Sequence, residues 1–162
     1  MSERAAEEVY EDEDPVELLE ELLKEVTVGF GLECEVVVEQ EDDVLRGRVE
    51  GEDVGLLIGR RGQTIDAVQH LAQRIVFPGG RAAARVVVDA DGYRDRRAQA
   101  LRLDADDAAE EALRSGEPVE LDPMPASERR VVHEYLRERG DVETHSEGEE
   151  PERYLVVSPA AR

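Results

Sequence analysis

The sequence of 162 residues contains no tryptophan and no asparagine, a single cysteine, a single lysine, and only 4% aromatic residues. A lone cysteine, Cys34, cannot form a disulfide within the chain, so the cysteine content does not indicate secretion. No run approaches the ~18 apolar residues of a membrane-spanning helix, and the acidic start lacks the basic and then apolar pattern of a secretory signal. These absences favour a cytoplasmic protein without membrane insertion, in which Cys34 is a buried structural thiol.

Basic residues are scarce beside acidic ones. The chain has 41 aspartates and glutamates against 20 lysines and arginines, which gives a net charge of −21. Taken alone, this composition disfavours non-specific nucleic-acid binding and indicates an acidic interaction protein. The charge is uneven, however, because residues 54–88 hold one acid, Asp66, against five arginines, net +4. Salt screens charges over ~8 Å, so such a patch can act against the overall sign; chance clustering is the alternative interpretation.

Apolar periodicity and turn residues predict two domains of mixed helix and strand content, an α+β fold class. Residues 1–14, with seven acids, are expected to form a disordered acidic tail. Residues 15–91 predict helix, strand, strand, helix, helix and strand. The expected elements are a helix from Pro15 with Asp14 as its cap, strands at 33–39 and 44–50, a short turn at 54–58, a helix whose apolar face holds Ile65, Val68, Leu71, Ala72 and Ile75, and a strand at 85–89.

Residues 92–162 predict a second domain with the order helix, strand, helix, strand, strand. The expected elements are a long charged helix at 93–114, a short strand at 118–121, a helix from the cap Ser127 to about Arg139, and strands at 142–145 and 154–157. No internal repeat is visible. We therefore expect a small α/β domain after the first one.

The turn Gly59-Arg60-Arg61-Gly62 lies between an apolar turn and an amphipathic helix. Glycines let the backbone approach a ligand closely, and the start of the following helix favours phosphate. Arg60 and Arg61 add positive charge where a sugar-phosphate chain would pass. The turn is not a nucleotide P-loop, because no Gly-Lys-Ser/Thr follows it. Two strands before it and one after it are the arrangement of a KH domain, whose Gly-x-x-Gly loop clamps single-stranded nucleic acid.

A second candidate site is the helix that contains Arg129 and His133. They are four positions apart, so both lie on one helix face, and Arg137 extends the stripe by a turn. Arginine offers a planar fork for phosphate and histidine offers further donors. Val131, Val132 and Leu136 would face the core. The alternative is a solvated helix face on which Arg130 and Glu134 simply form an ion pair.

Together these motifs resemble the Jag (SpoIIIJ-associated) family of bacterial proteins, which joins a KH domain to an Arg-x-x-x-His (R-three-H) domain. The resemblance runs from about Pro15 to Pro159. It is carried by residues 58–71, by Tyr93, Arg94 and Arg97, by Pro123-Met124-Pro125, by Glu128 to His133 and by residues 141–151. It implies a type II KH domain, whose first element is a helix, followed by a small R-three-H domain, both binding nucleic acid and chiefly RNA.

The resemblance implies RNA-binding residues at Gly59, Arg60, Arg61 and Gly62, and at Arg129 and His133. The expected function is a non-catalytic protein that binds single-stranded RNA, or single-stranded DNA, as a post-transcriptional regulator. No cofactor, metal site or catalytic residue is expected, because His70, His133 and His145 lack metal-ligand spacing. The expected protein partner is another small KH protein. The alternative function is an acidic protein–protein adaptor that does not bind nucleic acid directly.

The acidic tail leaves two interpretations open. Tethered to the same chain, it is at high effective concentration near the arginines of the Gly-x-x-Gly turn and could compete with RNA for them. The alternative is a solubilising tail that contacts nothing.

Overall fold

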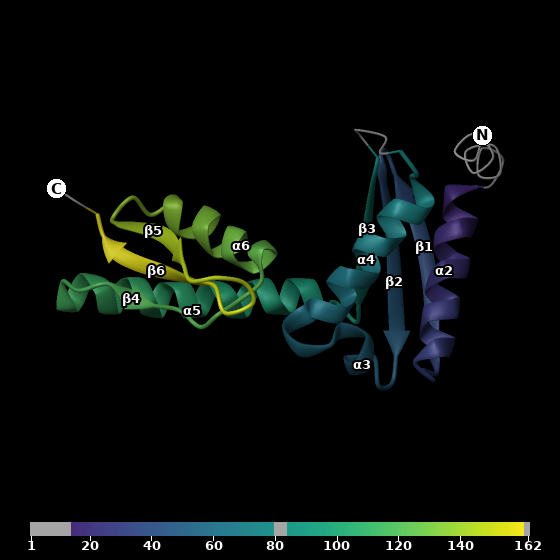
Figure 1. Ribbon diagram of the computed structural model, residues 1–162, viewed down its shortest axis with the longest axis horizontal. Helices are drawn as coiled ribbons and strands as arrows, with labels where there is room; N and C mark the ends of the chain where they lie inside the picture. Colours follow the sequence, from purple (N-terminus) through teal and green to yellow (C-terminus); the bar gives the residue numbers. More distant parts are fainter. Residues whose placement is uncertain (1–13, 80–83, 161–162) are drawn as a thin grey trace. The chain divides into compact units, whose positions relative to one another are not determined.

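The structure is a computed structural model that describes residues 14–79 and 84–160. Arg81 and the predicted acidic tail, apart from its last residue Asp14, therefore lie outside the described residues. The chain divides into two compact units, Met1–Tyr93 and Arg94–Arg162. Each unit is described by itself below (Figure 1).

The first unit has the predicted order of helix, strand, strand, helix, helix and strand. Its elements are α2 (Pro15–Gly29), β1 (Cys34–Glu41), β2 (Val44–Gly51), α3 (Gly55–Ile58), a 3-10 turn η1 (Arg60–Gly62), α4 (Gln63–Val76) and β3 (Arg85–Ala90). The Asp14 carboxylate accepts a hydrogen bond from the Val16 amide at 3.0 Å, which confirms the predicted cap of α2.

The three strands form one sheet in the order β1-β2-β3. β1 and β2 pair antiparallel as a hairpin across Asp42-Asp43, whereas β2 and β3 pair parallel, with Leu45 opposite Val86. A parallel pair needs a crossover connection, and here α3 and α4 provide it. The crossover places the Gly-x-x-Gly turn between these two helices.

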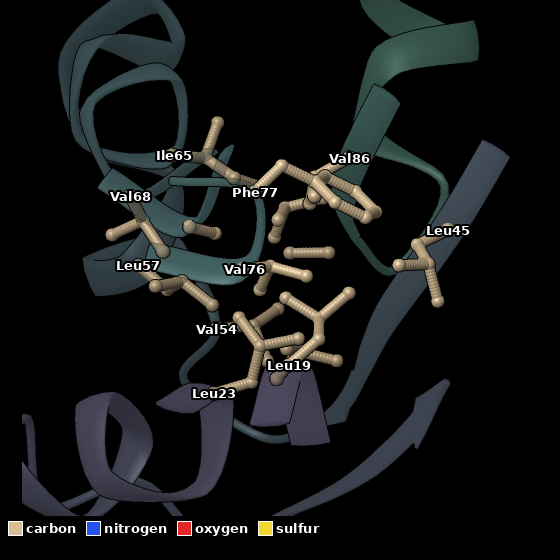
Figure 2. Close-up of a cluster of buried hydrophobic side chains, with 14 residues drawn as sticks. Leu19, Leu23, Leu45, Val54, Leu57, Ile65, Val68, Val76, Phe77 and Val86 are labelled. Atoms are coloured by element: carbon tan, nitrogen blue, oxygen red, sulfur yellow. The ribbon is translucent and has the colours of Figure 1, made fainter. Parts of the chain in front are cut away.

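Helices α2 and α4 contact each other and the sheet, and their apolar faces build the core of the first unit (Figure 2). Leu19 and Leu23 from α2 are fully buried, as are Ile65 and Ala72 from α4. Gly47 on β2 lies under α2; a Cβ there would collide with a Leu23 methyl carbon, so glycine permits this close helix–sheet contact.

Two sequence predictions about the first unit are wrong in detail. Leu71 was expected on the buried face of α4, but its side chain is 50% exposed and Val76 is buried instead. The buried positions 65, 68, 72 and 76 form one stripe at helical spacing, and Leu71 lies beside it. Cys34 is half-buried, because it is the first residue of β1, at the end of the hairpin.

Glutamine side chains of α4 cover the open edge of β3. The Gln69 side-chain oxygen accepts a hydrogen bond from the Val88 amide at 2.9 Å. The Gln73 side-chain oxygen accepts one from the Val86 amide at 2.7 Å. The Gln73 amide also donates to the Ala84 carbonyl at 3.1 Å. An edge strand presents unpaired backbone groups that invite association with other strands. These glutamines provide acceptors for the Val86 and Val88 amides and a donor for the Ala84 carbonyl within the chain.

The second unit also has the predicted order. Its elements are α5 (Tyr93–Ser115), β4 (Val119–Glu120), α6 (Ala126–Arg137), β5 (Val142–Glu147) and β6 (Tyr154–Pro159), and its sheet has the order β4-β6-β5 with antiparallel pairing throughout. Small residues of α5, among them Ala105 and Ala109, pack against Val132 and Leu136 of α6 and Val157 of β6. The alanine stripe on α5 thus contributes to the apolar core of the second unit.

The helix α6 is capped two residues earlier than predicted, at Pro125 and not at Ser127. Pro125 is the cap residue and makes no side-chain capping bond, so Ser127 lies within the first turn. What anchors this turn is Glu128, which is buried and accepts two hydrogen bonds from the Arg97 guanidinium of α5, at 2.7 and 2.8 Å. A bidentate pair of this kind fixes orientation as well as distance.

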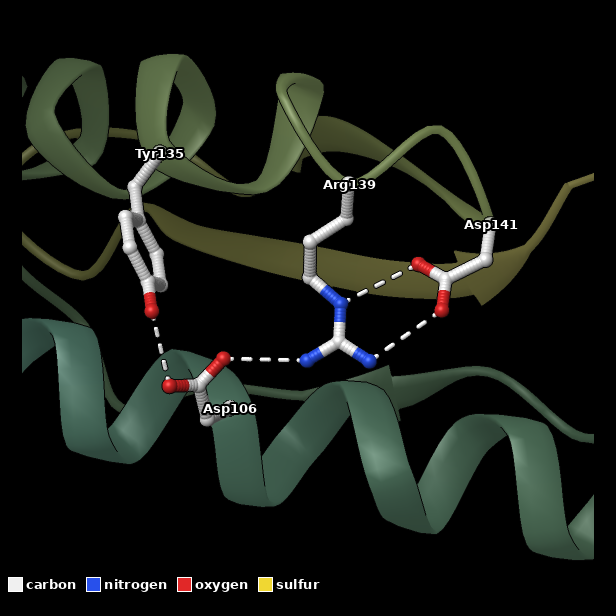
Figure 3. A network of polar contacts seen from close by, with 4 residues as sticks. All are labelled: Asp106, Tyr135, Arg139 and Asp141. Carbon is white, nitrogen blue, oxygen red and sulfur yellow. Dashed lines mark hydrogen bonds and ion pairs between the residues drawn. The ribbon is translucent and has the colours of Figure 1, made fainter.

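A network of hydrogen bonds joins the C-terminal end of α6 to α5 (Figure 3). The Arg139 guanidinium donates to both carboxylate oxygens of Asp141 at 3.1 Å and to Asp106 of α5 at 3.0 Å, and the Tyr135 hydroxyl donates to Asp106 at 2.8 Å. These bonds raise the pKa of Arg139 and of Tyr135, and the bonds from Arg139 lower the pKa of Asp141. Asp106 therefore acts within the fold of this unit.

Candidate nucleic-acid interface

The backbone of the Gly-x-x-Gly turn has φ and ψ angles that favour glycine. Gly59 has φ 71° and ψ −174°, a backbone region that residues other than glycine essentially do not adopt. Gly62, the cap residue of α4, has φ 77° and ψ 7°. Arg61 between them has φ 51° and ψ 34°, which is uncommon for arginine. The chain thus reverses sharply between α3 and α4.

Close packing also requires glycine at both ends of the turn. A Cβ on Gly59 would collide with the Thr64 hydroxyl oxygen, and a Cβ on Gly62 would lie 2.9 Å from the Tyr93 ring. Gly62 is buried, whereas Arg60 beside it is exposed and Arg61 is half-exposed. The turn is therefore tightly packed at both glycines, and Arg60 is its exposed side chain.

The surroundings of the turn suit an anion. In the described part of the chain no carboxylate forms an ion pair with Arg60, which leaves its guanidinium available. The turn leads directly into the N-terminus of α4, the positive end of that helix dipole. The amides of Gly59 and Gly62 donate to carbonyls of α3 and of the turn itself, so a helix N-terminus and two arginines are what this turn offers to a sugar-phosphate backbone.

The second unit has a hollow of about 370 Å³ between the first turns of α6 and the strand β5. Its lining includes both sequence-predicted residues of this unit, Arg129 and His133. The other lining residues are Ala126, Arg130, Thr144, His145, Ser146 and Leu155. The structure thus places Arg129 and His133 at one concave surface. Arg137, the predicted extension of the stripe, is exposed on α6 but does not line the hollow.

Arg129 is largely buried and forms two hydrogen bonds within the unit, which the sequence did not predict. Its guanidinium donates to the Met124 carbonyl at 2.9 Å and to the Glu150 carboxylate at 2.7 Å. Only 11% of its side chain is exposed, against 56% of the Glu150 side chain. Arg129 therefore ties the loop before α6 to the connection between β5 and β6, besides lining the hollow.

His133 faces β5 across the hollow. Its Nδ1 lies 2.5 Å from the Thr144 hydroxyl oxygen, and the neighbouring His145 has its Nε2 2.7 Å from the Glu147 carboxylate. Thr144, His145 and Glu150 were not predicted from the sequence as neighbours of this site. The signal that could have found Thr144 is its alternation with Val142 along the predicted strand 142–145, which puts both on one face.

The described residues contain neither a metal site nor a membrane-spanning helix. Segments 14–79 and 84–160 have no group of histidine, cysteine, aspartate and glutamate arranged to hold a metal ion. No helix described there combines the length and apolar character needed to cross a membrane.

The fold and the two surfaces define a protein that joins a KH domain to an R-three-H domain. The family model described as "KhpA/KhpB, KH domain" matches residues 16–90, and the family model of the R-three-H domain matches residues 99–159. The first match covers the Gly-x-x-Gly turn and the second covers Arg129 and His133.

Three curated relatives are named RNA-binding protein KhpB. The protein of Bacillus subtilis is 33% identical over 149 residues, which cover 90% of this chain and 71% of the relative. That of Clostridium symbiosum is 34% identical over 140 residues, covering 85% and 63%. That of Lactiplantibacillus plantarum is 45% identical over 104 residues, covering 64% and 32%. The chain belongs to the KhpB (Jag) family, and it spans about a third to seven-tenths of the length of these relatives.

Proposed function

We propose that this protein is a non-catalytic binder of single-stranded RNA and acts as a post-transcriptional regulator. The Gly-x-x-Gly turn clamps the sugar-phosphate backbone through Arg60 and Arg61 at the N-terminus of α4. The hollow of the R-three-H domain adds phosphate contacts from Arg129 and His133. The observation that carries the proposal is the backbone of the turn, in which Gly59 and Gly62 hold an otherwise unfavourable reversal and Arg60 is left exposed. The name RNA-binding protein shared by the relatives supports it.

The direct test is RNA binding by the double variant Arg60→Asp with Arg61→Asp, measured by filter binding over a range of salt concentrations. We expect most binding to be lost and the log–log salt slope to fall by roughly 1.4, since each phosphate contact on a single strand contributes about 0.7. The control is Arg46→Asp with Arg114→Asp, which changes the net charge equally at two exposed arginines paired with Glu41 and Glu111. Unchanged affinity in the folded double variant would exclude the turn as the binding site.

The hollow of the R-three-H domain is tested with two single variants that the structure predicts to differ. His133→Ala should weaken RNA binding and leave the free energy of unfolding nearly unchanged, because His133 is exposed. Arg129→Ala should weaken binding and also destabilise the unit by about 1–2 kcal/mol, because it removes the bond to the Met124 carbonyl. Neither should alter sequence preference, since phosphate contacts position the strand and base contacts specify it.

A protein partner of the same kind is part of the proposal. The KH family model that matches residues 16–90 carries the names of both KhpA and KhpB, and we propose another small KH protein as the partner. If the wild-type protein binds no RNA at any salt concentration, the acidic adaptor becomes the better account of a chain with net charge −21.

A further inference from the structure

Both arginines that line the hollow of the R-three-H domain form an ion pair with a carboxylate of the same unit, and so does one of the two histidines that line it. The three pairs are Arg129–Glu150 at 2.7 Å, Arg130–Glu134 at 2.8 Å and His145–Glu147 at 2.7 Å. Two of the carboxylates are local: Glu134 is one helical turn from its partner, and Glu147 is two residues from its partner along β5. Glu150 is 21 residues from Arg129 in sequence, so only the fold brings this pair together.

The Arg129–Glu150 pair combines a fixed cation with an accessible anion. The Arg129 side chain is largely buried and is also held by the Met124 carbonyl. The Glu150 side chain is mostly exposed and belongs to the connection between β5 and β6. Glu150 can therefore turn into solvent while Arg129 stays in place at the hollow. The hydrogen bond from Arg129 lowers the pKa of Glu150 and so favours its charged form.

A carboxylate and a phosphate oxygen use the same chemistry toward arginine. Both accept charge-assisted hydrogen bonds from the planar guanidinium fork. A nucleic-acid phosphate that enters the hollow therefore meets an Arg129 whose charge is already neutralised and both of whose terminal amino groups are bonded, one to Glu150 and the other to the Met124 carbonyl. Either the phosphate displaces Glu150 or it binds against an adjacent negative charge.

We propose that Glu150, assisted by Glu134 and Glu147, is an intramolecular counterion that RNA must displace from the hollow of the R-three-H domain. These carboxylates thereby set the affinity and the salt response of the second unit. The inference rests on the proposed RNA binding and adds residues that determine its strength. On this proposal, a chain of net charge −21 carries arginines at a binding surface whose charge is neutralised until a polyanion displaces the carboxylate.

The proposal makes the salt dependence informative. An arginine that is free before binding contributes about 0.7 to the log–log slope on a single strand. Displacing Glu150 instead leaves a carboxylate unpaired beside the incoming phosphate, and their repulsion is strongest at low salt and screened at high salt. The wild-type unit should therefore have a shallower slope than its arginines alone would give.

The experiment compares the full chain with Glu150→Gln and with Glu149→Gln, using a short single-stranded RNA of mixed sequence across a salt series. Glu149 is the matched control: it is the exposed neighbour of Glu150, and its loss changes the net charge equally. We expect Glu150→Gln to bind about two- to fivefold more tightly at low salt, the range of an exposed ion pair. We expect this gain to shrink as salt rises, and Glu149→Gln to show less.

Two outcomes overturn the inference while leaving the proposed function intact. Equal gains in both variants mean that only net charge matters. Weaker binding by a folded Glu150→Gln protein means that Glu150 positions Arg129 for RNA instead of competing with it. If neither the wild type nor any variant binds RNA, the proposed function fails and this inference fails with it.

A measurement on the wild-type protein does not depend on how the variants fold. The side-chain carboxyl carbon signals of Glu150 and Glu149 are followed by NMR during titration with inorganic phosphate and then with the RNA. Displacement moves the Glu150 signal and leaves that of Glu149 in place. A Glu150 signal that stays unchanged while His133 responds to the RNA overturns the proposal.

Discussion

The side-chain oxygen of Gln73 accepts the backbone amide of Val86 at 2.7 Å, which joins α4 to the outer edge of β3. Amides on that edge have no neighbouring strand within the described part of the chain, because β3 is the last strand of its sheet. The bond therefore replaces one that a further strand would make. It also fixes α4, and with it the Gly-x-x-Gly turn at the start of that helix, against the sheet.

Gln73→Ala should destabilise the first unit by about 1–3 kcal/mol, because Val86 is buried and its amide would lose its acceptor. Urea unfolding followed by circular dichroism measures the change. The control is Gln63→Ala, the same substitution at an exposed position of the same helix, where we expect a change within about 0.5 kcal/mol. Equal effects of the two substitutions would show that the Val86 bond contributes nothing.

Gly59→Ala should cost more stability than Gly31→Ala, although both glycines have similar positive φ angles, 71° and 70°. At Gly31 nothing lies within 4 Å of the added Cβ, so only backbone strain of roughly 1–2 kcal/mol applies. At Gly59 the Cβ would collide with Thr64, and the backbone region excludes side chains more strongly.

The two glycine variants are compared by their urea midpoints and by RNA affinity. We expect Gly59→Ala alone to lose RNA binding under conditions where it is still folded, because the turn must rearrange to relieve the contact with Thr64. Similar midpoints together with unchanged binding in both variants would contradict the geometry described for the turn.

The acid stability of the second unit should depend on Asp141. Hydrogen bonds from Arg139 hold the pKa of this carboxyl below its usual range in the folded protein. A group with a lowered pKa contributes stability above its unfolded pKa, which is about 3.9 for aspartate. That contribution is lost as the pH falls through the lower, folded pKa. Asp141→Asn should therefore lower the Tm at neutral pH, and its difference from the wild type should shrink in acid.

Thermal unfolding of the wild type and Asp141→Asn across a pH series measures this effect. Glu143→Gln, an exposed change on the same strand region, is the control and should follow the wild type. A Tm difference for Asp141→Asn that is constant with pH would show that the network of Figure 3 acts through packing and not through charge.

The sequence alone determined the element order, the two-domain plan and the likeness to a protein with a KH and an R-three-H domain. These follow from local signals: apolar periodicity, glycines and prolines at turns, and the Asp14 cap, all of which act within a few residues. Gly59 and Gly62 were identifiable for the same reason, since a tight turn depends mainly on its own residues. Errors at this level were small, such as Leu71, because two neighbouring apolar stripes of one helix are nearly equivalent until packing selects one.

Only the tertiary structure decided which side chains meet. Gln73 and Val86 are 13 residues apart, Arg97 and Glu128 are 31 apart, and Arg129 and Glu150 are 21 apart. Sequence spacing predicts neighbours at three or four residues on a helix and at two on a strand, but carries no signal for partners across elements. Arg129 was found from its place in a motif, whereas its pairing with Glu150 arises because the fold brings the β5–β6 connection beside the first turn of α6.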